Sequence, residues 1–94
     1  MLSREDARAK ALEVIAHKCL DEVVILDAAT LEFSLGWVFF YQSKDFVVTG
    51  NPSSQLAGNA PIIVNRATGA VSVTGTAHPI EHYVRQYELA NGGI

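Results

Sequence analysis

The segment His78-Pro79-Ile80-Glu81-His82 has the spacing of the inverted zinc-protease motif, H-x-x-E-H. That chemistry needs two imidazoles one helical turn apart, a carboxylate as base, and a third metal ligand from elsewhere in the chain. Pro79, however, places His78 at the start of a helix, and the short tail after His82 is poorly suited to return a ligand. The context therefore favours two solvent-facing histidines, and we expect neither a metal nor a cofactor.

A second candidate for chemistry is Cys19, which follows His17 by two residues. A Cys–His pair can form a nucleophile, but a lone cysteine on a helix is more often a small buried hydrophobe. Ser53-Ser54 and the segment 74–76 lack the residues that surround a phosphate loop or a nucleophile elbow. No catalytic set is recognisable, and we expect a protein that is not an enzyme.

The bulk composition describes one folded domain, residues 1–94, with 49% apolar and 18% charged residues. The seven Lys and Arg residues are scattered and the net charge is −3, so we expect no binding to nucleic acid. No apolar stretch approaches the roughly 20 residues of a membrane span, and the acidic N-terminus is unlike a secretion signal. The single cysteine excludes an internal disulfide. We therefore expect a cytoplasmic protein that does not bind membranes.

Periodic patterns predict a helix, a series of short strands and a second helix. Ser3 has the form of a helix N-cap, and apolar residues at three- and four-residue spacing continue to about Leu20. Runs typical of strands follow at residues 23–26, 31–33, 36–41, 46–48, 62–64 and 71–73. A bulge or turn is expected at 27–30, between the first two of these runs. The order predicts an α+β fold: an N-terminal helix, an antiparallel sheet of four or five strands, and a C-terminal helix packed on the sheet.

The C-terminal helix is predicted from Pro79, which suits a first helical position. Its cap is expected to be His78 or Thr76. An apolar stripe at helical spacing then identifies the face that packs on the sheet, formed by Ile80, Tyr83, Val84 and Tyr87.

The densest apolar segment is an aromatic run, in which Trp37, Phe39 and Tyr41 point to one face of a strand and Val38 and Phe40 to the other. Apolar residues on both faces predict a central strand that is covered on both sides.

The turn residues of two connections predict their structures. Asn65-Arg66-Ala67-Thr68-Gly69 is predicted to close a hairpin, with Gly69 supplying a positive φ. Ser43-Lys44-Asp45 is predicted to be a turn that leads into a short edge strand, Phe46–Val48. Such an edge would be able to pair across a homodimer.

The longest stretch of turn-forming residues is 49–61, and unstructured loops of this length are often functional. Arg66 is the only charged residue between Asp45 and Glu81, so a partner would meet this loop through hydrogen bonds and shape. Acidic Asp21, Glu22 and Glu32 would suit a basic cleft. Candidate partner-binding positions are therefore the polar or exposed residues near the loop and the strand ends: Tyr41, Asn51, Gln55, Asn59, Arg66 and Glu32.

Two linked strings carry a family resemblance: Gly36-Trp37-Val38-Phe39-Phe40-Tyr41, and Leu56-Ala57-Gly58-Asn59-Ala60-Pro61-Ile62-Ile63-Val64. The second is followed by Gly69, and by Gly75-Thr76 before Pro79-Ile80-Glu81. Together they resemble the immunity protein 35 family, also called YrhB-like domains, from the first helix to Tyr87.

The resemblance implies a bacterial α+β immunity protein, encoded beside a polymorphic toxin and neutralising it by direct, non-catalytic binding. It also implies an alternative, because the family includes free-standing members without an evident toxin. For those members the implied role is that of a chaperone-like or stress-related protein-binding domain. The shared residues are mainly glycines, prolines and aromatics, so the resemblance identifies the domain better than its binding surface.

Overall fold

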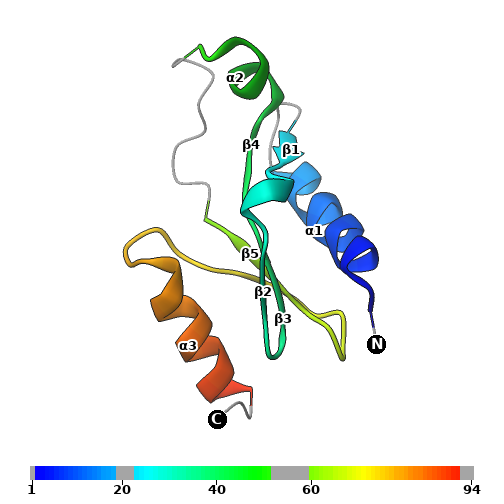
Figure 1. Ribbon diagram of the computed structural model, residues 1–94, viewed down its shortest axis with the longest axis vertical. Coiled ribbons are helices and arrows are strands. Elements are labelled where there is room, and N and C mark those ends of the chain that lie inside the picture. Colours follow the sequence, from blue (N-terminus) through cyan, green and yellow to red (C-terminus); the bar gives the residue numbers. More distant parts are fainter. Residues whose placement is uncertain (1, 19–22, 52–59, 92–94) are drawn as a thin grey trace.

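The computed structural model describes residues 2–18, 23–51 and 60–91 (Figure 1). The chain is α+β, as the sequence predicted. In chain order its elements are α1 (Arg4–Lys18), β1 (Val23–Ile25), the 3-10 turn η1 (Asp27–Ala29), β2 (Leu31–Phe33), β3 (Gly36–Phe39), β4 (Tyr41–Ser43), α2 (Lys44–Thr49), β5 (Ile62–Asn65), β6 (Val71–Val73) and α3 (Ile80–Ala90). No helix in the described ranges is long and apolar enough to cross a membrane.

The first helix begins at the predicted cap. The Ser3 hydroxyl accepts a hydrogen bond from the Asp6 amide at 3.1 Å, and the Asp6 carboxylate accepts one from the Ser3 amide at 3.3 Å. This reciprocal pair satisfies two amides at the helix start. From there Ala7, Ala11 and Ile15, four residues apart, present one fully buried face.

The main sheet has four antiparallel strands in the order β2-β3-β5-β6, so β3 is central. The aromatic run is longer than β3 and is divided between two sheets. After Phe40 the chain continues as β4, which pairs with β1 in a separate two-stranded sheet. The division lies opposite η1, because the residues of η1 separate the two partner strands, β1 and β2. At this point the Leu26 amide donates a hydrogen bond to the Phe40 carbonyl oxygen at 2.8 Å.

The alternation predicted for the aromatic run is confirmed. Trp37 and Phe39 face α1 together with their cross-strand partners Val64 and Ile62, and all four are buried in one core. Val38 and its partner Ile63 are buried on the opposite face, on the side of α3. Helices α1 and α3 therefore flank the sheet (Figure 1).

The predicted turn and strand at 43–48 are wrong, because these residues form the helix α2. The Ser43 hydroxyl accepts a hydrogen bond from the Phe46 amide at 3.1 Å and caps the helix. Gly50, at φ 71°, closes the other end by donating its amide to the Phe46 carbonyl oxygen at 2.7 Å. A helix has no strand edge to share, so the expected route to a homodimer is lost.

The predicted hairpin between β5 and β6 is confirmed. The Asn65 side-chain oxygen accepts hydrogen bonds from the amides of Ala67 and Thr68 at 2.9 and 3.1 Å. Gly69 has φ 75°, and its amide donates to the Asn65 carbonyl oxygen at 2.8 Å. Asparagine side-chain bonding and a positive-φ glycine together close the turn.

The predicted cap of the last helix is wrong. The N-cap residue of α3 is Pro79, which makes no side-chain cap bond, and neither His78 nor Thr76 takes that place. The approach to the helix is instead fastened by Tyr83, whose hydroxyl accepts hydrogen bonds from the amides of Ala77 and His78, each at 3.2 Å. A side chain in the first turn of α3 thus fixes the start of the helix, a role that the sequence predicted for His78 or Thr76.

Candidate functional site

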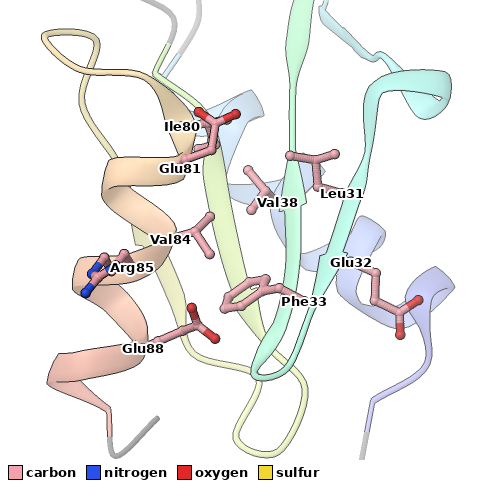
Figure 2. A pocket seen from close by; sticks show the side chains of 9 residues that line it. All are labelled: Leu31, Glu32, Phe33, Val38, Ile80, Glu81, Val84, Arg85 and Glu88. Atoms are coloured by element: carbon pink, nitrogen blue, oxygen red, sulfur yellow. The ribbon is translucent and has the colours of Figure 1, made fainter. Parts of the chain in front are cut away.

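A groove of about 450 Å³ lies between α3 and the β2–β3 hairpin (Figure 2). Its apolar lining comes from both sides. The hairpin contributes Leu31, Phe33 and Val38, and α3 contributes Ile80 and Val84. Leu31 keeps 43% of its surface exposed although its cross-strand partner Val38 is fully buried. The groove is therefore an apolar surface that the fold covers only in part.

The charged residues around the groove are mainly acidic. Glu32, Glu81 and Glu88 line it, with Arg85 as the one cation among the lining residues. Figure 2 shows Glu81 and Glu88 on the groove side of α3 near its two ends, while Arg85 points away. The Ser34 hydroxyl donates a hydrogen bond to the Glu88 carboxylate at 2.7 Å, which holds this carboxylate beside the β2–β3 turn.

The groove stays open because α3 is fastened to the sheet through a few large side chains. The Tyr87 ring meets the Phe33 ring edge-on, with centroids 5.9 Å apart, and its hydroxyl accepts a hydrogen bond from the Asn65 side-chain amide at 3.2 Å. No residue of α3 is fully buried. A second groove, of about 330 Å³, runs along the other side of α3 and includes Ile63, Tyr83 and Tyr87.

Two of the predicted contact residues, Arg66 and Glu32, are brought together by the structure. One guanidinium nitrogen of Arg66 donates to the Glu32 carboxylate at 3.0 Å and to the Phe33 carbonyl oxygen at 2.7 Å. The guanidinium also lies over the Trp37 ring, 4.9 Å from its centroid. Arg66 thus ties the β5–β6 turn to the β2–β3 hairpin, and the Glu32 carboxylate already has a cation beside it.

The remaining predicted contacts are scattered. Tyr41 lies in the core beneath α1 with only 5% of its surface exposed, so the surface position expected for it is wrong. Asn51 is exposed directly after the Gly50 cap of α2. The other four expected positions, Gln55, Asn59, Asp21 and Glu22, lie outside the described residues.

The histidines of the zinc-like motif are solvent-facing, as expected. The rings of His78 and His82 lie 4.2 Å apart between centroids, tilted by 38°, and both residues are exposed. Within the described ranges, no three His, Cys, Asp or Glu residues are grouped so as to hold a metal ion. Cys19 lies outside the described residues.

One ion pair far from the groove has a structural role. Arg8 donates to both carboxylate oxygens of Asp27, at 2.7 and 3.3 Å, and so joins α1 to η1. The hydrogen bond from Arg8 holds the pKa of Asp27 below its ordinary value. A lowered pKa stabilises the fold above the ordinary Asp range, and this contribution is lost as the pH falls through the folded-state pKa. Both side chains are well exposed, so the effect is small.

The sequence reasoning missed the groove residues Leu31, Glu81 and Glu88. The apolar stripe predicted that Ile80 and Val84 face the sheet, and the structure leaves both residues half-buried. The available signal was the acidic residue near each end of the predicted apolar stripe, at two positions seven residues apart. That spacing places both carboxylates near the same side of a helix.

Comparisons with known proteins agree with one another. The model of the family described as immunity protein 35 matches residues 5–86. The uncharacterized protein YrhB of Escherichia coli K12 is 37% identical over 89 residues, which cover 95% of this chain and 92% of that relative. No solved structure matches the chain. Because the family model spans most of the chain and the relative is similar over nearly its full length, this chain is a member of the immunity protein 35 family.

Proposed function

We propose that this chain is a cytoplasmic immunity protein that binds and neutralises a bacterial toxin domain encoded beside it, without catalysing a reaction. Membership of the immunity protein 35 family carries the proposal. An inhibitor of this kind needs a rigid surface that a protein partner can cover, rather than a reactive group. A surface of this kind lies beside α3, where partly exposed apolar side chains are bordered by carboxylates.

The geometry of the groove supports protein binding over small-molecule chemistry. Specific protein interfaces combine an apolar centre with a polar rim. Here the centre is formed by Leu31, Phe33 and Val84, and the rim by Glu81 and Glu88. The groove, at about 450 Å³, has room for side chains of a partner.

The test is co-expression of this chain with the protein encoded by the neighbouring gene. We expect growth to be restored, and the purified pair to elute as a stable complex during gel filtration. An inactive variant of the same toxin should bind equally well, since binding rather than repair of damage is responsible. A toxin that stays unbound and fully active in the presence of excess protein would contradict the proposal.

A chaperone-like function is the second candidate, favoured by apolar side chains exposed away from the groove. Val48 on α2 is 72% exposed and Leu89 on α3 is 64% exposed. Such side chains can hold unfolded clients with little selectivity. Suppression of luciferase aggregation on heating would support this function, provided that Val48→Ser together with Leu89→Ser reduces it. Stoichiometric inhibition of the toxin with no effect on luciferase would exclude it.

A further inference from the structure

We propose that the groove between α3 and the β2–β3 hairpin receives a basic segment of the toxin. An apolar side chain of that segment would enter between Leu31 and Val84, and flanking Lys or Arg side chains would pair with Glu81 and Glu88. The inference rests on the proposed function and adds the chemistry of the partner and the place where it binds.

Incomplete burial leaves an apolar surface open at the edge of the main sheet. Leu31 and Val38 are cross-strand partners on the same face of the sheet, yet Val38 is fully buried and Leu31 is 43% exposed. Leu31 lies on the edge strand β2, which α3 covers only in part. A partner side chain placed beside Leu31 would complete the apolar layer that α3 forms over this face of the sheet.

The charges select the kind of partner. Glu81 and Glu88 are seven residues apart on α3, which is two helical turns or about 10 Å. They therefore border the apolar centre at two points on the groove side, while Arg85 is turned away (Figure 2). Among the described residues Glu81 has no ion pair, and Glu88 is held by the neutral Ser34 hydroxyl. Two such carboxylates attract a segment with spaced basic side chains and repel an acidic one.

The opposite side of the sheet offers less to a partner. There α1 covers the sheet with Ala7, Ala11 and Ile15, which have no exposed surface. Arg66, which lies over Trp37 on that side, already contacts Glu32. Binding to the sheet on that side would require this packed layer to open, whereas the groove is accessible in the folded protein.

The first experiment measures affinity for the toxin encoded by the neighbouring gene. The groove variants are the charge reversal Glu81→Lys with Glu88→Lys, and the apolar change Leu31→Ser. Their matched controls are Glu5→Lys with Glu13→Lys on exposed positions of α1, and Leu89→Ser on α3. Circular dichroism and thermal unfolding check that each variant is folded.

We expect the charge reversal to raise Kd by about 10- to 100-fold and to remove much of its dependence on salt. Leu31→Ser should raise Kd by about 10-fold, and both controls should stay within about 3-fold of the wild type. If the wild type binds and the groove variants bind equally well, the groove is not the binding site, although the proposed function still holds. Absence of wild-type binding would overturn the proposed function itself.

The second experiment does not require the toxin. A synthetic amphipathic Lys/Leu peptide is titrated into the isotope-labelled protein, and amide shifts are followed by NMR. We expect saturable shifts concentrated at 31–33, Val38 and α3, and much smaller shifts with the matching Glu/Leu peptide. Equal responses to the two peptides, or shifts centred on α1 or α2, would show that the groove does not select a basic segment.

Discussion

Gly36 occupies a position that no larger residue can take without a shift of the backbone. A Cβ added there would overlap the carbonyl oxygen of Val64 on the neighbouring strand β5, and would crowd the Arg66 amide at 3.2 Å. The glycine therefore lets β3 and β5 approach where the aromatic run begins. The sequence pattern placed Gly36 at the start of the strand 36–41 but did not show this close approach, because the approach involves a residue far along the chain.

We predict that Gly36→Ala lowers the free energy of unfolding by about 3 kcal/mol, at the upper end for overpacking against backbone. The control is Gly50→Ala, where nothing lies within 4 Å and only the positive φ of 71° opposes a side chain. That substitution should cost about 1–2 kcal/mol. Urea unfolding measures both, and an equal or larger loss in Gly50→Ala would contradict the packing argument.

Arg66 shows how an isolated charge can be misinterpreted from sequence. As the only charged residue between Asp45 and Glu81, it resembled a solvent-facing contact for a partner. In the structure its guanidinium contacts Glu32, the Phe33 carbonyl oxygen and the Trp37 ring. Its position is explained by internal contacts between two hairpins, and a role in partner binding remains a prediction.

At the scale of elements, α2 depends on its caps. Phe46, Val47 and Val48 have side chains that favour strands, but Ser43 and Gly50 provide both ends of a short helix. The capping bonds outweigh a weak side-chain preference, because an isolated edge strand here would leave its amides unpaired. The error in the sequence prediction came from giving the β-branched run more weight than the residues at its ends.

We predict that Ser43→Ala destabilises the protein by about 1 kcal/mol, because the Phe46 amide loses its side-chain acceptor. Ser43→Thr retains the hydroxyl and should recover most of that loss. Thermal unfolding and the helical signal in circular dichroism report the change. The capping role would be refuted if the Thr variant were as unstable as the Ala variant or if neither differed from the wild type.

At the scale of the whole molecule, the two faces of the main sheet are unequal. The α1 side contains the dense core, with Ile15 fully buried against it. The α3 side leaves Val84 half-buried and has a groove on each side of the helix. Stability is therefore concentrated on one face, and open surface for a partner on the other.

We predict opposite effects for two truncations. Ile15→Ala should lower the free energy of unfolding by about 2–5 kcal/mol but leave toxin affinity nearly unchanged at temperatures where the variant is folded. Val84→Ala should cost only about 1 kcal/mol of stability and weaken binding by about 5-fold or more. Calorimetric unfolding and titration with the toxin separate these effects, and a similar stability loss in both variants would contradict the asymmetry.

The sequence alone was sufficient for features that depend on neighbouring residues. These are the capped α1 helix, the alternating faces of Trp37 and Val38, the hairpin closed by Gly69, the stripe of α3, and the family itself. Helical and strand periodicity and turn chemistry act within a few residues, so they are visible in the chain. Only the tertiary structure decided the division of the aromatic run between two sheets, the burial of Tyr41 and the joining of Arg66 to Glu32. It also decided the groove, because α3 must dock on β2 and β3 before residues roughly fifty positions apart can line one surface.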